Sequence, residues 1–151
     1  MTRGRKPLQR GDVVLVTFPF TDLSGSKKRP AVVLQTETAQ SIDTILAFIS
    51  SVISKPIGKA EIVLTPTQRD FATTGLKVPS IIRLDKLATL DRRLVVRKLG
   101  ALSQRQIQQI DGALLNALEI SLKPYLGIER QRLAEIAQKQ GLERLLAELQ
   151  Q

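Results

Sequence analysis

Alternating and continuous apolar runs, separated by short polar segments, predict β-strands along most of the chain. The first two runs, 11–20 and 29–35, are rich in β-branched residues. The polar segment 21–28 between them has Gly25 near its middle, which favours two antiparallel strands joined by a long loop. The second run is almost continuously apolar from residue 31 onward, so we expect its strand in the centre of a sheet.

Shorter apolar runs that follow predict further strands over residues 44–54, 61–64, 78–84 and 94–99. Two local helical segments are expected between them. Thr65 as N-cap and Pro66 at the first helical position predict a short helix over 65–71. Residues 85–90 are expected to form one helical turn.

The apolar spacing becomes helical after residue 102. Ser103 and Gln106 form a capping-box pattern that predicts a helix over 103–121. Its sheet-facing side is expected to consist of Ile107, Ile110, Leu114, Ala117 and Leu118. A second leucine stripe predicts an amphipathic helix over 129–151, with Gly141 as a weak point.

These elements predict a mainly β fold with α (α+β), a small curled antiparallel sheet crossed by one helix. We expect a flexible, solvated basic arm over residues 1–10, a folded domain over 11–128, and an amphipathic helical extension over 129–151. The extension is expected either to fold back on its own domain or to pair with another subunit.

The charge is strongly positive and unevenly distributed. The net charge is +9 and the isoelectric point is about 10.4. Cations and acids cancel in residues 129–151, so the whole excess lies before residue 129. This asymmetry favours a polyanionic partner such as nucleic acid, although many basic proteins bind none.

Composition also excludes several kinds of chemistry. The sequence has no cysteine and no histidine, which rules out disulfides, zinc clusters, thiol nucleophiles and paired-histidine ribonuclease chemistry. No apolar run approaches the roughly 18 residues that span a membrane, and the basic start does not resemble a signal peptide. A cytoplasmic location fits this composition, and we expect no membrane contact and no cofactor.

Two groups of cations are candidates for binding phosphate. Lys27, Lys28 and Arg29 lie at the start of the second strand. Pro30 follows them, at a position where its missing N–H disturbs the hydrogen bonding between strands least. The fork-shaped guanidinium of Arg29 is suited to phosphate there. The densest basic segment is 83–98, for which a solvated strand edge is the alternative interpretation; its cations are Arg83, Lys86, Arg92, Arg93, Arg97 and Lys98.

Several separated motifs resemble those of the MazF/PemK toxins of bacterial toxin–antitoxin systems. They are Arg-Gly-Asp-Val at 10–13, Phe-Pro-Phe-Thr-Asp-Leu-Ser-Gly-Ser at 18–26, Arg-Pro-Ala-Val-Val-Leu at 29–34, Ile-Ser-Ser at 49–51, Gly75-Leu76, Ser80 through Leu87, and 93–100. They follow the family's order and spacing over about residues 10–121. The resemblance implies an SH3-like barrel of the MazF/PemK/CcdB type.

The resemblance also implies an activity, a metal-independent and sequence-specific endoribonuclease that cleaves single-stranded mRNA. The family's catalytic arginine corresponds to Arg29 and its catalytic threonine to Ser50. Serine keeps the hydroxyl but lacks the methyl group that restricts the rotamer, and its alternative is a plain hydroxyl at the sheet edge. Asp22 is the candidate base nearest in sequence, with a turn-capping side chain as the alternative. Side chains expected to bind RNA are Lys27, Lys28, Ser51, Arg83 and Lys86. Phe48, where close relatives often carry a polar residue, is expected to reshape the RNA groove.

Such chemistry suits a chain without histidine, because RNA carries its own nucleophile in the 2′-OH. The enzyme has to align that oxygen and stabilise charge on the phosphorane. The expected products are a 2′,3′-cyclic phosphate and a 5′-OH. By resemblance, the partners are a second copy in a homodimer and a cognate antitoxin with an acidic disordered segment. Operator DNA is expected to bind only through the antitoxin.

Two other functions remain open on the same fold. Ser50 in place of threonine motivates a catalytically silent binding module that acts as a transcriptional co-regulator with the antitoxin. A poison of DNA gyrase is the least favoured, since related gyrase poisons use a helix that ends the chain, whereas this chain continues into the extension.

Overall fold

The computed structural model describes residues 5–18, 27–53, 56–125, 130–141, 144 and 147. The chain divides into two compact units, residues 1–119 and 120–151, and each is described by itself. The first unit contains the sheet and α1 (Gln104–Ala117). The second contains η3 (Lys123–Tyr125) and α2 (Arg130–Gln140).

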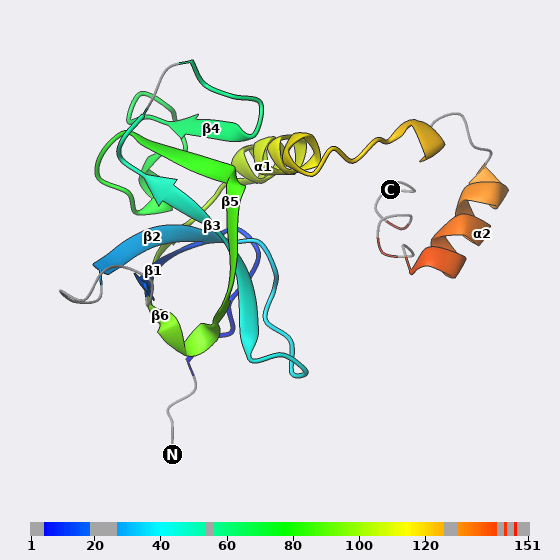
Figure 1. The fold of residues 1–151 in the computed structure, drawn as a ribbon, viewed down its shortest axis with the longest axis horizontal. Helices are drawn as coiled ribbons and strands as arrows, with labels where there is room; N and C mark the ends of the chain where they lie inside the picture. The colour runs from blue at the N-terminus through cyan, green and yellow to red at the C-terminus, as the bar shows by residue number, and fades with distance from the viewer. Residues whose placement is uncertain are drawn as a thin grey trace. The chain divides into compact units, whose positions relative to one another are not determined.

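Six antiparallel strands form one curled sheet in the first unit (Figure 1). They are β1 (Asp12–Phe18), β2 (Lys27–Val33), β3 (Asp43–Ser50), β4 (Glu61–Leu64), β5 (Ser80–Asp91) and β6 (Val95–Ala101). The spatial order is β4-β5-β3-β2-β1-β6, so β2 lies inside the sheet as predicted. The α+β class is confirmed, but the sheet is not closed, because β4 and β6 remain as its two edges in the described part of the chain.

Alternating side chains of β1 fill two separate cores, one on each face of the sheet. Val13 belongs to the core beneath α1, together with Val32, Ile82 and Ile110. The opposite face of β1 contributes Val14, Val16 and Phe18 to the second core. The predicted period of two is confirmed, and full burial of each such side chain stabilises the fold by roughly 1.5–3 kcal/mol.

The capping box that begins α1 is present as predicted. The Ser103 Oγ accepts from the Gln106 N–H at 3.1 Å, and the Ser103 N–H donates to the Gln106 Oε1 at 2.8 Å. Ile110 and Ala113 are buried on the face turned to the sheet. The helix ends at Ala117, earlier than expected, and Leu118 is 53% exposed.

Two predicted helical segments are wrong. Residues 65–71 form turns, because the Gln68 side chain accepts from the Thr65 N–H and donates to the Val63 carbonyl. The predicted turn at 85–90 is instead part of β5, which pairs with β3 over Leu87 and Leu90. In both places tertiary contacts override the local preference.

Residues 5–10 also differ from the expected solvated arm. Leu8 is only 4% exposed, and its N–H donates to the Glu37 carboxylate at 2.8 Å. Arg5 forms an ion pair with Glu37, and Arg10 forms one with Asp111 of α1. The arginines that suggested a free arm therefore attach this segment to the first unit.

The helical extension is confirmed over α2, and Gly141 leaves the helix with a φ of 70°. The leucines of the predicted stripe beyond Gly141 lie outside the described residues. The proposed domain boundary at residue 128 remains a prediction. None of the helices in the described part of the chain has the length and apolar character needed to cross a membrane.

Candidate active site

A hollow of about 510 Å³ lies where β2 begins and β3 ends, bordered by the segment that precedes β5. Its apolar lining consists of Pro30, Ile49, Val52, Leu76, Val78 and Leu99. The polar side chains at its wall are Arg29, Ser50, Ser51, Lys77 and Ser80. A volume of this size is in the range that holds a small ligand or one nucleotide.

The strand register explains why Arg29 and Ser50 share this hollow. Ala31 of β2 pairs with Phe48 of β3 in antiparallel register. Continuing that register by one pleat places Arg29 opposite Ser50, and both residues line the hollow. The structure therefore brings together the arginine and the hydroxyl that the sequence singled out.

The Ser50 hydroxyl is oriented by the backbone that follows it. The Val52 N–H donates to the Ser50 Oγ at 3.1 Å, a local turn that fixes the serine side chain. Because the oxygen accepts this bond, its own O–H remains able to donate to a ligand. Ser51, the next residue, also lines the hollow.

Among the described residues, the two charged side chains of the lining are cationic. Arg29 and Lys77 are exposed and form no ion pair with any carboxylate that the structure describes. An arginine fork and a lysine ammonium beside serine hydroxyls form a suitable site for a phosphate group.

Other predicted RNA-binding residues lie away from this lining. Lys27 and Lys28 precede Arg29 on β2 and are exposed. Arg83 pairs with Asp85 at 3.0 Å and Glu61 at 3.6 Å, and the hydrogen bond that Arg83 donates to Asp85 raises the pKa of Arg83. Lys86 lies further along β5 and is exposed. Asp22 lies outside the described residues.

Most cations of the basic segment 83–98 are paired with carboxylates, several of them from other parts of the chain. Arg92 pairs with Glu37 at 2.9 Å, Arg93 with Asp91 at 2.7 Å, and Lys98 with the buried Asp12 at 3.0 Å. Arg92 and Arg93 belong to η2 (Arg92–Leu94), which joins β5 to β6. The interpretation of this segment as a phosphate-binding face is therefore not supported by its contacts.

Phe48 does not line the hollow. Its ring packs edge-on against Phe18, with 4.4 Å between the centroids, beside the second core. The expectation that Phe48 reshapes a groove for RNA therefore stays a prediction, and this hollow does not test it. Phe18 is buried and Phe48 is half-buried, so this contact gives the Phe48 ring a packing role.

The sequence analysis gave no binding role to Lys77, to Ser80 or to the apolar side chains that complete the wall, although Leu76 and Ser80 belong to motifs that it named. Leu76, Lys77 and Val78 come from the segment between η1 (Ala72–Thr74) and β5. Gly75 was the available signal, because a glycine in a loop often marks a close approach of two backbones.

Gly75 makes such an approach. Its φ is 73°, and a Cβ at this position would lie 2.0 Å from the Leu99 carbonyl oxygen. On the facing strand, a Cβ on Gly100 would lie 2.4 Å from the Thr73 carbonyl oxygen. Two glycines therefore let the segment that forms the wall lie directly against β6.

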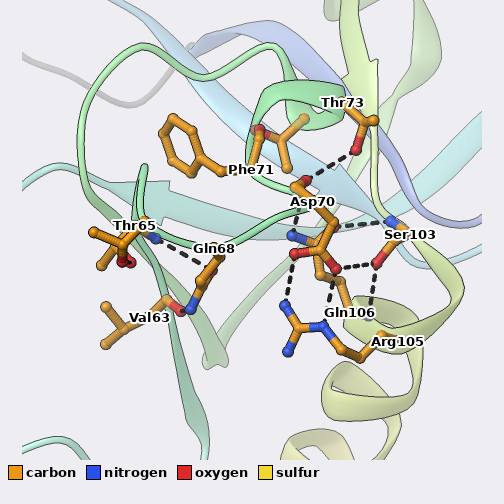
Figure 2. Close-up of polar contacts among 11 residues, drawn as sticks. Val63, Thr65, Gln68, Asp70, Phe71, Thr73, Ser103, Arg105 and Gln106 are labelled. Carbon is orange, nitrogen blue, oxygen red and sulfur yellow. Dashed lines mark hydrogen bonds and ion pairs between the residues drawn. The ribbon is translucent and has the colours of Figure 1, made fainter.

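Asp70, which lies just before η1, anchors this part of the chain to the start of α1 (Figure 2). Its carboxylate accepts from the Ser103 hydroxyl at 2.5 Å and from two nitrogens of Arg105 at 2.6 and 3.0 Å. The hydrogen bond from Arg105 is the main reason that the pKa of Asp70 falls to about 2, with that from Ser103 second. The Gln106 amide adds a bond to the Asp70 carbonyl.

The residues that the structure describes contain no group of three acidic side chains placed to hold a metal ion. What the hollow can supply is cationic charge, hydroxyl donors and an apolar wall. That set is suited to binding and polarising a phosphodiester.

Comparison with protein families gives one model that matches residues 9–118, described as PemK-like, MazF-like toxin of type II toxin–antitoxin system. The Endoribonuclease MazF of Staphylococcus epidermidis is 32% identical over 120 residues, which cover 76% of this chain and 91% of that protein.

Solved structures share the fold at lower identity. Mycobacterium tuberculosis toxin MazF-mt6 aligns with a TM-score of 0.58 and 20% identity, covering 73% of this chain and 98% of that one. The MazE-MazF (Form-III) crystal structure from Deinococcus radiodurans aligns with a TM-score of 0.59 and 20% identity, covering 76% of this chain and 98% of that one. A mycobacterial endoribonuclease in complex with its cognate antitoxin aligns with a TM-score of 0.56 and 16% identity, covering 74% of this chain and 95% of that one.

Proposed function

The chain belongs to the PemK-like, MazF-like toxins of type II toxin–antitoxin systems, and on that premise we propose that it is an endoribonuclease that cuts single-stranded mRNA. The observation that carries the proposal is the meeting of Arg29 and Ser50 in one hollow, where the charged residues that the structure describes are both cations. Residues 11–128 are the proposed toxin domain, and 129–151 are its extension. Its place of action is the cytoplasm, where mRNA is found.

The reaction needs little from the protein beyond alignment and charge. The RNA 2′-OH attacks the adjacent phosphorus and the bond to the 5′ oxygen breaks, which leaves a 2′,3′-cyclic phosphate and a 5′-OH. The Arg29 guanidinium neutralises charge on the phosphorane oxygens, and the Ser50 O–H donates to one of them. Histidine and cysteine take no part, since the sequence has neither.

The proposed partners follow from the same site. Relatives include a MazE-MazF pair and an endoribonuclease bound to its cognate antitoxin. We infer an antitoxin whose acidic segment reaches the cations of the hollow and competes with RNA. A homodimer completes the active particle, and operator DNA is contacted only through the antitoxin.

The activity is tested by incubating the purified full chain with a long single-stranded RNA in the presence of EDTA. We expect discrete cuts at one short sequence, with fragments that end in a cyclic phosphate and begin with a 5′-OH. Absence of discrete cuts, or cuts that require a divalent ion, would contradict the proposal. The silent binding module is then the function to pursue.

A further inference from the structure

We infer that Lys77 holds an RNA phosphate beside the one that is cleaved, an inference that rests on the proposed function. Arg29 supplies a cation from β2, and Lys77 supplies a second from the segment before β5. Single-stranded RNA carries a phosphate at every nucleotide, so two cations in one hollow match two consecutive phosphates.

The backbone that carries Lys77 is fixed on both sides. Before it, the Leu76 N–H donates to the Thr74 hydroxyl at 3.2 Å, and the Thr74 hydroxyl donates to the Phe71 carbonyl at 2.6 Å. After it, the Ser80 hydroxyl donates to the Val78 carbonyl at 2.8 Å. A lysine on such a segment has its Cα placed in advance, which lowers the entropic cost of gripping a ligand.

The charge of Lys77 is also available. Seven other described cations of the first unit are held in ion pairs: Arg5, Arg10, Arg83, Arg92, Arg93, Lys98 and Arg105. Lys77 forms none with a described carboxylate, and Arg29 is the other charged side chain that the described residues contribute to the wall. Bringing a phosphate to Lys77 therefore breaks no such ion pair.

The chemistry of the side chain favours phosphate over a base edge. A lysine ammonium is a compact, strongly hydrated point charge, which suits a phosphate oxygen approached from solvent. Loss of a phosphate contact weakens binding about equally for all RNA sequences and lowers the salt dependence of binding. A base contact would instead change which sequence is cut.

The test measures binding of a short 2′-O-methyl RNA, which cannot be cleaved because its 2′ oxygens are blocked. We expect Lys77→Met to weaken its binding about fivefold. The slope of log K against log salt should fall by about 0.7, the value for one phosphate contact to a single strand. With cleavable RNA, KM should rise while kcat and the cut sequence stay unchanged, and Lys77→Arg should restore both affinity and slope.

Lys59→Met is the matched control, an exposed lysine of the same unit that does not line the hollow. It should bind like the wild type, and melting temperatures check that every variant is folded. Unchanged affinity and slope in Lys77→Met, or a changed cut sequence, would overturn the inference. If Lys77→Met lowers affinity and slope as expected but the wild type cuts no RNA, the proposed function fails, and Lys77 is a phosphate contact of an RNA-binding protein that does not cleave.

Discussion

The first unit has two basic regions that differ in what their cations contact. Between Arg83 and Lys98, most of the cations are joined to carboxylates, including Arg92 to Glu37 and Arg93 to Asp91. In the hollow, Arg29 and Lys77 meet no described carboxylate and lie beside serine hydroxyls. The segment with more cations in its sequence is thus the one whose positive charges are more often offset by carboxylates in the structure.

The difference shows that the density of cations along a chain is a poor guide to where an anion binds. A cation that already has a carboxylate partner attracts a phosphate less, because the carboxylate offsets its positive charge. A cation without a carboxylate partner attracts the phosphate with its full charge. Ion pairs in the segment 83–98 join β5 and β6 to neighbouring parts of the fold, whereas the hollow keeps its charge for a ligand.

Arg29→Ala is expected to have the largest effect, because it removes the guanidinium proposed to stabilise the phosphorane. The rate of RNA cleavage should fall by about 10²–10³-fold, as when one donor to a developing charge is lost. Single-turnover cleavage of a labelled RNA measures this fall. Thermal melting should remain unchanged, since Arg29 is exposed and has no described ion pair.

Arg93→Ala provides the matching change in the other basic region. The Arg93 side chain is 85% exposed and is paired with Asp91. Because that charge is already neutralised, cleavage should stay at the wild-type rate. Equal losses of cleavage in the two variants would remove the distinction between the regions.

Gly75→Ala tests whether the wall that carries Lys77 depends on the close backbone contact with β6. The new Cβ would lie 2.0 Å from the Leu99 carbonyl oxygen, at a positive φ that L side chains rarely adopt. The free energy of unfolding should fall by at least about 2 kcal/mol, measured by urea denaturation.

Gly112→Ala is the control for this prediction, since a Cβ on that glycine of α1 meets nothing within 4 Å. The same change of residue there should stabilise the protein by roughly 0.5–1 kcal/mol, because alanine favours helix. A loss of stability at both positions would show that the contact with β6 is not the cause.

Much of the fold could be predicted from the sequence, because burial enforces periodicity. The alternation in β1, the central place of β2 and the capping box of α1 are all visible in the pattern of residues. The errors fall where distant contacts decide. Residues 85–90 have an ambiguous pattern and become strand only because β3 pairs with them.

The site could be predicted in part. Arg29, Ser50 and Ser51 were found from their motifs and do line one hollow. Lys77 could not be predicted as part of the site, because the residues around it in sequence do not indicate that it shares a hollow with Arg29 of β2. The misleading weight given to residues 83–98 has the same origin, since their acidic partners Glu37 and Asp12 are remote in sequence.

Asp70→Asn tests an ion pair that holds structure rather than binding a ligand. The Asp70 carboxylate has a pKa lowered from 3.8 to about 2 by its contacts with Arg105 and Ser103. A lowered pKa means that its stabilisation is complete above the unfolded value and is lost as the pH falls from about 4 to about 2. At neutral pH the urea midpoint of the wild type should be higher than that of Asp70→Asn. As the pH falls across that window, the two midpoints should approach each other.

Arg105→Gln should behave in the same way, because it removes the partner that lowers the pKa of Asp70 most. Cleavage at neutral pH should change little in either variant. If the wild type and Asp70→Asn lose stability in parallel between pH 4 and 2, the ion pair contributes nothing to the acid response.

Ser50→Thr should have the smallest effect. Threonine keeps an oxygen that can accept from the Val52 N–H, the bond that orients Ser50 at 3.1 Å. Its methyl group restricts the rotamer, so cleavage should rise about twofold, equivalent to roughly 0.5 kcal/mol of side-chain freedom. Ser50→Ala, which removes the donor, should lose far more activity in the same assay. Growth arrest by Ser50→Thr, where the natural chain causes none, would mean that serine silences the site, and the cationic hollow would then serve binding alone.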